Sequence, residues 1–116
     1  MVGLDVPVIP VEHQFLVTEQ HPEIMERKKQ GLPEMAVLRE SDSAYYLREE
    51  AGGMILGIYE KGAPACYVDG PSKDCQYELF NGELDRIMPH IDRCISRVPA
   101  FGAVSYTHLR AHETFA

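Results

Sequence analysis

A histidine and a glutamine stand inside an apolar run near the start of this 116-residue chain, in the segment PVIPVEHQFLVTE at residues 7–19. Burying a polar group without a hydrogen-bond partner costs on the order of a few kcal/mol, so both positions need a physical reason. An imidazole titrates near neutral pH and can take or hold a proton during a reaction. His13 is therefore a candidate catalytic residue, and the alternative is a strand histidine that a neighbouring group satisfies.

A second group of chemically capable side chains lies in AYYLREE at residues 44–50. Successive side chains of a strand point to opposite faces, so only one of Tyr45 and Tyr46 can face a given cavity, and the other belongs in the core. Arg48 shares the face of Tyr46 and could bind a carboxylate through a bidentate guanidinium contact. A salt bridge of Arg48 with Glu50 or Glu12 is an equal alternative.

His108 and His112 are four residues apart, a spacing that puts two imidazoles on one helix face, where they could bind a metal. Their segment VSYTHLRAHET, residues 104–114, however resembles one reading frame of a transposase sequencing adapter. Residues 104–116 are therefore predicted to be a non-native tail, residues 1–103 to be natural protein, and no metal site is predicted. A genuine amphipathic C-terminus is the alternative.

Composition excludes several classes of protein. Hydrophobic residues make up 45% of the chain and charged residues 25%, as in ordinary globular proteins. The net charge of −7 argues against a nucleic-acid partner, and no apolar run approaches the roughly 20 residues that cross a bilayer. The three cysteines lack C-x-x-C spacing and no leader opens the chain, which favours free thiols in a reducing cytoplasm over a Cys66–Cys75 disulfide.

The hydrophobic pattern predicts an α+β fold with an antiparallel or mixed sheet. Residues 8–18 are rich in strand formers, residues 21–30 carry helix formers before a glycine, and three short apolar runs at 35–39, 44–49 and 53–59 suggest an antiparallel meander. Residues 61–74 read as a loop. From Leu84 onward, apolar residues recur at helical spacing and predict a helix that covers the sheet, kinked or begun at Pro89, with Cys94 packed in the core.

Two stretches taken together resemble the FAD-dependent dimethylglycine and sarcosine dehydrogenase family, within the amine oxidoreductases that are similar to D-amino-acid oxidase. The resemblance runs in order from residue 8 to residue 99. The matching motifs are His13-Gln14-Phe15, Val37-Leu38-Arg39, Tyr46-Leu47-Arg48-Glu49, Gly52-Gly53, Gly57, Glu60 and the helical segment at residues 84–91.

This resemblance implies part of the substrate-binding domain of a two-domain flavoprotein. Such an enzyme oxidises a secondary or tertiary amine on a small amino acid, with hydride transfer to FAD and, in some members, passage of the product to tetrahydrofolate. The glycine-rich half that holds FAD is absent from this sequence, so no cofactor-binding residue is assigned here. The partner is a small-molecule amine, and the oligomeric state stays open.

The resemblance also assigns the site residues. His13 and Tyr46 match positions proposed at the active site of the family, so they are the expected catalytic residues: His13 orients or deprotonates the amine, and Tyr46 hydrogen-bonds the substrate. Tyr45, Arg48 and Gln14 are the expected substrate-binding residues. Glu12, Glu49 and Glu60 are expected to be structural or exposed, and His21 and His90 to lie at the surface.

Two other functions stay open from the sequence. One is a small non-enzymatic α+β binding module that is complete in itself. The other is a related flavin amine oxidase that acts on a different N-methyl amine, without folate. An upstream G-x-G-x-x-G turn in the reading frame would favour an enzyme, whereas a true start codon would favour the module.

Overall fold

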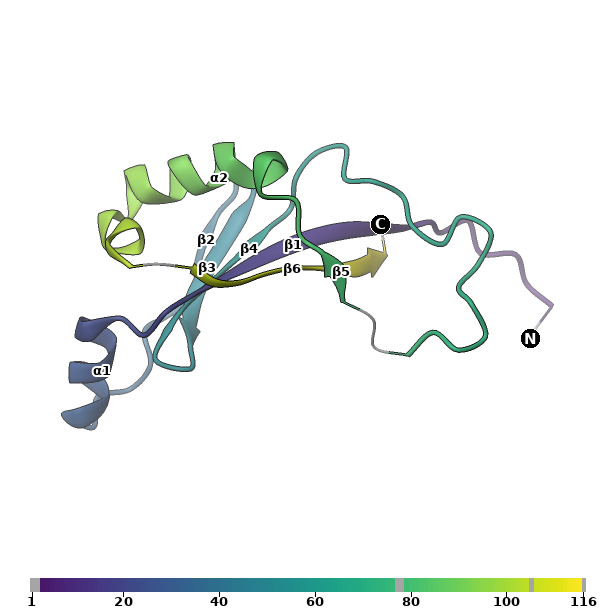
Figure 1. Ribbon diagram of the computed structural model, residues 1–116. Coiled ribbons are helices and arrows are strands. Elements are labelled where there is room, and N and C mark those ends of the chain that lie inside the picture. The colour runs from purple at the N-terminus through teal and green to yellow at the C-terminus, as the bar shows by residue number, and fades with distance from the viewer. Residues whose placement is uncertain (1–2, 77–78, 105, 116) are drawn as a thin grey trace.

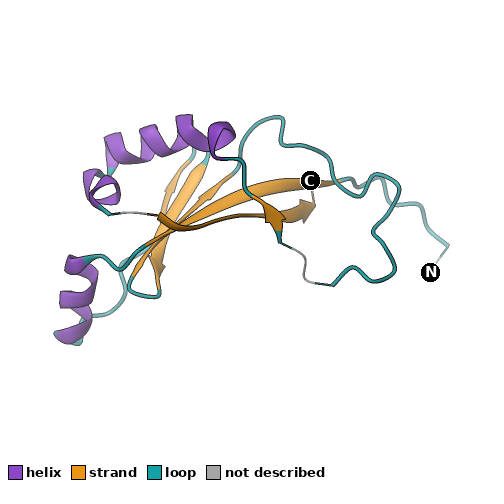
Figure 2. Cartoon of the chain, in the orientation of Figure 1, coloured by secondary structure: helices purple, strands orange, loops and turns teal. Residues whose placement is uncertain are grey.

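The computed structural model describes residues 3–76, 79–104 and 106–115, and of residues 106–115 only the backbone. Figures 1 and 2 show an elongated arrangement in which one helix lies across a twisted sheet and a second helix lies beyond the end of the sheet. The elements in chain order are β1 (Pro10–Thr18), α1 (Pro22–Lys29), β2 (Leu38–Glu40), β3 (Tyr45–Glu50), β4 (Gly53–Ile58), β5 (Phe80–Asn81), α2 (Leu84–Arg97), the 3₁₀ helix η1 (Pro99–Ala103) and β6 (Tyr106–Phe115).

The strands form a single sheet in the order β2-β3-β4-β1-β6-β5. Each neighbouring pair is antiparallel, which resolves the predicted choice between an antiparallel and a mixed sheet. The predicted meander is confirmed as β2-β3-β4, and the predicted α+β fold with a covering helix is confirmed as well. The central strand β4 joins the meander to β1 through the pairing of Phe15 with Gly57.

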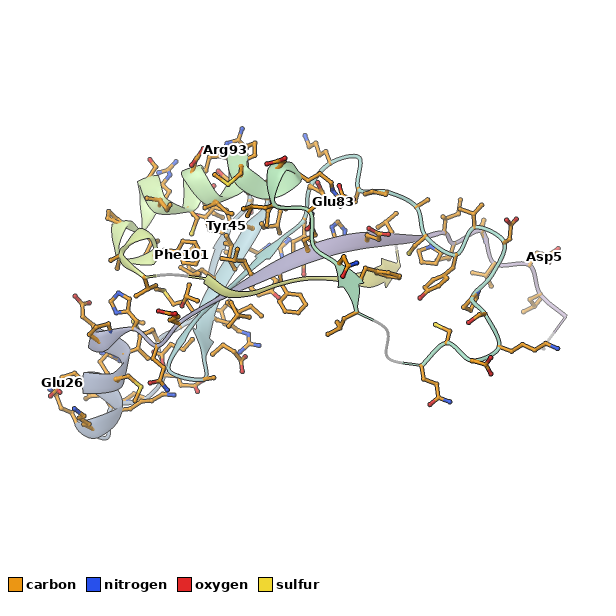
Figure 3. The ribbon with its side chains drawn as sticks, in the orientation of Figure 1. Asp5, Glu26, Tyr45, Glu83, Arg93 and Phe101 are labelled. Atoms are coloured by element: carbon orange, nitrogen blue, oxygen red, sulfur yellow. The ribbon has the colours of Figure 1, made fainter. Side chains whose placement is uncertain are left out.

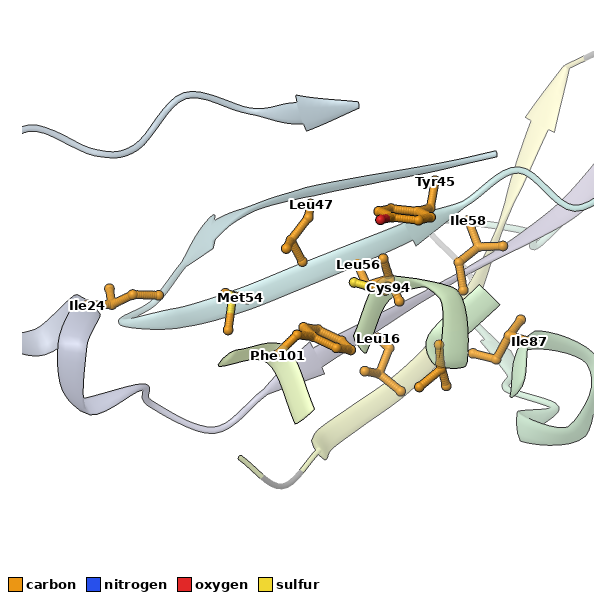
Figure 4. Close-up of a cluster of buried hydrophobic side chains, with 11 residues drawn as sticks. Leu16, Ile24, Tyr45, Leu47, Met54, Leu56, Ile58, Ile87, Cys94 and Phe101 are labelled. Atoms are coloured by element: carbon orange, nitrogen blue, oxygen red, sulfur yellow. The ribbon is translucent and has the colours of Figure 1, made fainter. Parts of the chain in front are cut away.

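The core lies between the sheet and α2, where Figure 4 shows the apolar side chains gathered. Ile87, Ile91 and Cys94 of α2 are fully buried, so this helix face packs as the sequence predicts. Leu84 and Met88, by contrast, are 41% and 37% exposed, because they flank the buried stripe. The other members of the core cluster are Leu16, Ile24, Tyr45, Leu47, Met54, Leu56, Ile58 and Phe101.

Helix α2 runs through Pro89 without ending there, so the proline neither begins nor breaks it. Pro89 is exposed, which places its ring away from the sheet. Helix α1 agrees with the prediction at both ends: it begins after His21 and is followed by Gly31, whose φ of 69° is easily adopted by glycine.

His21 was expected to lie at the surface, but it is buried, with only 6% of its surface exposed. Its Nδ1 accepts a hydrogen bond from the N–H of Glu23 at 3.2 Å, which caps α1, and its Nε2 lies 3.2 Å from the carbonyl oxygen of Ala100 in η1. His90 is half-buried, with Nδ1 2.7 Å from the carbonyl oxygen of Ser43. Both histidines therefore tie elements together.

The loop that follows β4 is anchored to the start of β1. The N–H of Glu12 donates to the carbonyl of Pro64 at 2.9 Å, and the N–H of Cys66 donates to the carbonyl of Pro10 at 3.0 Å. Cys66, Cys75 and Cys94 are all free thiols, as the sequence predicts. In the described part of the chain, no helix has the length and apolar character needed to cross a bilayer.

Candidate active site

The sheet has two chemically different faces, set by the alternation of side chains along each strand. We call the face that packs against α2 the covered face; it carries Leu16, Leu47 and Leu56, which are all buried. We call the opposite face the open face. Its side chains from β1, β2, β3 and β4, together with the residue after β4, are His13, Phe15, Arg39, Tyr46, Arg48, Ile55, Gly57 and Tyr59.

His13 lies on the open face, half-buried in the middle of β1. Its ring meets the ring of Tyr59 edge-on, with 5.2 Å between centroids and 73° between planes. Edge-to-face rings at this separation attract each other by about 0.5–1.5 kcal/mol beyond the burial of their surface. The aromatic contact therefore offsets part of the cost of placing an imidazole in this apolar strand.

Tyr46 reaches the same cluster from β3. Its ring centroid lies 5.9 Å from that of Tyr59, so Tyr59 contacts both His13 and Tyr46. Partial burial raises the pKa of Tyr46 above its ordinary value, with the neighbouring Tyr59 as a smaller cause. At neutral pH the phenol of Tyr46 is thus a protonated hydrogen-bond donor.

Gly57 makes room for Tyr46. It pairs with Phe15 on one side and with Tyr46 on the other, and a Cβ built on it would overlap the ring of Tyr46. The ring therefore lies directly over the backbone of β4. Gly57 is one of the motif residues of the sequence, but its pairing with Tyr46 depends on the strand register.

Arg39 and Tyr59 are members of this cluster to which the sequence analysis gave no role. The guanidinium carbon of Arg39 lies 5.4 Å from the centroid of the Tyr59 ring, within the range of a cation–π contact. Arg39 stands directly opposite Tyr46 in the β2–β3 ladder. Arg39 stands in the motif Val37-Leu38-Arg39, and Tyr59 directly precedes the motif residue Glu60, but only the register shows that Arg39 and Tyr59 meet.

Arg48 has the salt bridge that the sequence analysis gave as the alternative. Its Nη1 lies 2.7 Å from a carboxylate oxygen of Glu50 and donates to the carbonyl of Glu49 at 3.0 Å. Both members of the Arg48–Glu50 pair are about 40% exposed. The guanidinium of Arg48 is therefore already engaged.

Tyr45 and Gln14, both expected to bind substrate, lie on the covered face, and each is 1% exposed. Tyr45 packs in the core beside Cys94, and burial raises the pKa of both groups, that of Cys94 to about 11. Figure 3 shows Tyr45 between the sheet and α2. The structure thus separates Tyr45 from His13 and gives it a packing role.

Gln14 holds the start of α2. Its Oε1 accepts from the N–H of Glu83 at 2.6 Å and its Nε2 donates to the carbonyl of Glu83 at 3.2 Å. Both ends of the buried amide are thereby satisfied, which answers why an apolar strand tolerates it. The amide of Gln14 therefore faces α2 and not the open face, and its expected contact with substrate stays a prediction.

The other polar cluster surrounds Arg86 on α2. Arg86 hydrogen-bonds Glu60, lies 3.5 Å from Glu12 and 3.7 Å from Glu83, and has a pKa raised first by the Glu60 contact. These contacts join α2, β1 and the loop after β4. In the part of the chain whose side chains are described, no group of three potential metal ligands occurs, and His108 and His112 lie outside that part.

The residues present do not fit the pyrophosphate of FAD. A dinucleotide site needs a glycine-rich turn that leads from a strand into a helix. Residues 19–21, between β1 and α1, contain no glycine, and residues 82–83, between β5 and α2, contain only Gly82. No reaction step is therefore assigned to a flavin held by these residues.

Comparison with known proteins identifies clear relatives, although no family model matches the chain. Mitochondrial dimethylglycine dehydrogenases of Rattus norvegicus and Homo sapiens are 38% identical to it over 104 residues, 85% of this chain. A 4-methylaminobutanoate oxidase (formaldehyde-forming) of Paenarthrobacter nicotinovorans is 30% identical over 115 residues, 97% of this chain. The mitochondrial sarcosine dehydrogenase of Mus musculus is 29% identical over 99 residues.

The matches cover most of this chain but a small part of each relative. The chain spans 12% of the length of the two dimethylglycine dehydrogenases and 13% of that of the oxidase. The relatives are enzymes, and the resemblance seen in the sequence motifs is confirmed. Over this segment, the chain is similar to dimethylglycine and sarcosine dehydrogenases.

Proposed function

We propose that this chain is part of the substrate-binding domain of an FAD-dependent enzyme that oxidatively demethylates a small N-methylated amino acid, such as dimethylglycine or sarcosine. The relatives support this reaction class because they are named for dimethylglycine, sarcosine and 4-methylaminobutanoate. The observation that carries the proposal is the meeting of His13 and Tyr46 around Tyr59 on the open face.

The roles of the two residues follow from the chemistry of amine oxidation. Loss of hydride from the carbon next to nitrogen requires a free lone pair on the amine, so an ammonium must first give up its proton. Imidazole is the side chain whose ordinary pKa lies near neutral pH, so His13 would accept or orient that proton. Tyr46, as a protonated phenol, would donate a hydrogen bond to the substrate. FAD, bound outside these residues, would supply the hydride acceptor.

The shape of the chain supports its being part of a larger domain. Its radius of gyration is 16.7 Å, whereas a compact domain of this length has a value of about 13 Å. Large apolar side chains such as Leu4, Val6 and Val68 are at least 70% exposed. A larger protein would bury this surface together with the open face.

We also propose that residues 1–103 are the natural part of the domain and that residues 104–116 are a non-native tail. Strand β6 pairs with the whole length of β1, from Pro10 to Thr18. On this proposal, a different strand of the larger protein fills that edge of β1, since an open edge of this length promotes aggregation. Resequencing the locus without transposase adapters tests this: recovery of VSYTHLRAHET from unprocessed DNA would contradict it.

The test of the site uses the full-length protein that contains this segment. His13→Ala and Tyr46→Phe are each expected to lower kcat/KM for N,N-dimethylglycine by about tenfold or more, which corresponds to roughly 1.4 kcal/mol of transition-state stabilisation. Tyr45→Phe and His90→Ala are matched controls outside the cluster and should stay within about twofold of wild type. Unchanged kcat/KM in both site variants would contradict the assignment.

Formaldehyde release separates the enzymatic alternatives. One relative is named as a formaldehyde-forming oxidase, so this segment could also serve an oxidase that acts on another N-methyl amine. Measuring free formaldehyde with and without tetrahydrofolate tests the expected folate dependence. Similarity to these enzymes favours either enzyme over a self-contained binding module. The cytoplasmic location expected from the free thiols remains a prediction, because five relatives are named as mitochondrial.

A further inference from the structure

We infer that Arg39, held against the ring of Tyr59, binds the carboxylate of the substrate. This inference rests on the proposed function and adds to it the group that selects amino acids over simple amines. Arg39 belongs to the motif Val37-Leu38-Arg39, but the sequence alone does not show that it lies beside the proposed site.

The position of Arg39 suits a substrate that carries amine and carboxylate on one carbon. Such a substrate needs its two recognition groups side by side. Arg39 pairs directly with Tyr46 across β2 and β3, and side chains in such pairs start about 4.5–5.5 Å apart. Tyr59 contacts Tyr46, His13 and Arg39 at centroid distances of 5.9, 5.2 and 5.4 Å.

Arg39 is also available for a ligand, unlike Arg48 and Arg86. In the part of the chain with described side chains, no carboxylate lies within the 4.0 Å limit of an ion pair with Arg39, and its side chain is exposed. Arg48 is engaged by Glu50 at 2.7 Å. Arg86 lies among Glu12, Glu60 and Glu83.

Tyr59 acts in this arrangement as a positioning residue. A guanidinium that rests on an aromatic face keeps its N–H groups free at the edge, where they can bind a carboxylate in bidentate fashion. Tyr59 is 39% exposed, so a small ligand can approach the edge of the stacked pair. The ring also restricts the rotamers of Arg39, which lowers the entropic cost of binding.

The experiment compares N,N-dimethylglycine with its methyl ester in the full-length protein, because the ester keeps the amine and lacks the charge. Arg39→Ala is expected to lower kcat/KM for dimethylglycine by about 30-fold or more, and that for the ester by less than about threefold. Arg39→Lys should fall between wild type and Arg39→Ala. Arg48→Ala tests the other arginine of this face. The control is Arg93→Ala, at an exposed arginine of α2, which should change neither substrate by more than about threefold.

Tyr59→Leu tests the positioning role. It is expected to raise KM for dimethylglycine about fivefold to tenfold with a smaller change in kcat, and to leave the KM of the ester unchanged. Flavin content and melting temperature check that each variant is folded. A fold-defective Arg39→Ala would be replaced in the comparison by Arg39→Gln, which keeps the length and polarity of the side chain.

Equal losses on the two substrates in folded Arg39 variants, or a larger loss in Arg48→Ala, would overturn the inference and leave the proposed function intact. A wild-type protein that oxidises neither compound, nor any other N-methyl amino acid, would instead contradict the proposed function, and the carboxylate role of Arg39 with it. Activity on dimethylglycine with loss confined to that substrate in Arg39→Ala supports both.

Discussion

The polar side chains on the two faces of the sheet have different kinds of partner. On the covered face, the buried side chains of Gln14, Thr18 and Glu49 are each held by a hydrogen bond to a backbone group. Thr18 accepts from the N–H of Met54 at 2.9 Å and donates to the carbonyl of Glu19 at 2.8 Å, and Glu49 accepts from the N–H of Met35 at 2.8 Å. These groups join neighbouring segments and are thereby committed to structure.

On the open face, the polar side chains of the cluster instead contact the ring of Tyr59. His13, Tyr46 and Arg39 all surround Tyr59, which is itself partly exposed. Polar residues of both faces look alike in the sequence, since each interrupts an apolar strand. The comparison teaches that a partner in the backbone marks a structural residue, whereas a cluster on an uncovered face marks a candidate site.

We expect the largest loss of activity from Gly57→Ala, which displaces Tyr46 from the cluster on the open face. A methyl group there would overlap the Tyr46 ring, and Tyr46 must rotate away because the clash lies with the side chain. Displacing a positioned group by about 1 Å can cost about 100-fold in turnover, and we expect a loss of that order in kcat/KM. In a Tyr46→Ala background the same substitution should have little further effect, and an undiminished loss there would contradict this account.

Gln14→Ala should destabilise the packing on the covered face without a specific effect on activity. It removes both hydrogen bonds to the backbone of Glu83 and leaves a cavity, so we expect the free energy of unfolding to fall by about 2 kcal/mol. Urea unfolding measures the loss, and hydrogen exchange at the Glu83 amide should accelerate. Gln14→Glu keeps the acceptor but buries a carboxylate against the carbonyl oxygen of Glu83, so it should lose at least as much stability. A kcat/KM decrease as large as that of His13→Ala would instead support a role of Gln14 in the site.

Because Cys94 is buried on the covered face, the free energy of unfolding should also fall at alkaline pH. Burial raises the pKa of Cys94 from 9.0 to about 11, so the native state holds this proton more tightly than the unfolded state does. The stabilisation is complete below pH 9 and is lost as the pH rises toward 11, amounting to about 1 kcal/mol between pH 8 and pH 10. Cys94→Ala should flatten this decline in urea unfolding, whereas Cys75→Ala should not.

Arg48→Ala should have the smallest effect on stability. The Arg48–Glu50 pair is about 40% exposed, and exposed ion pairs contribute roughly 0.2–1 kcal/mol. We expect a change of about 0.5 kcal/mol or less in urea unfolding, diminishing further in high salt. A loss of several kcal/mol would show that Arg48 supports the sheet in a way that its contacts do not indicate.

Local patterns were sufficient to predict most of the elements, but not β5, η1 or β6. The strand at β1, the meander β2-β3-β4, helix α1 with its glycine stop and helix α2 all follow from periods of two and of about 3.6 residues. Alternation also predicted that Tyr45 and Tyr46 face opposite sides. These features depend on residues that are close in sequence, where steric and hydrophobic preferences act directly.

The sequence by itself therefore determined the α+β class, the resemblance to dimethylglycine and sarcosine dehydrogenases, and the two motifs that hold His13 and Tyr46. Only the tertiary structure decided that Gln14 binds Glu83, 69 residues away, that His21 is buried, and that Tyr59 and Arg39 complete the cluster. The physical reason is strand register: contacts between distant segments depend on how the strands align, and a shift of one residue would move every side chain to the other face.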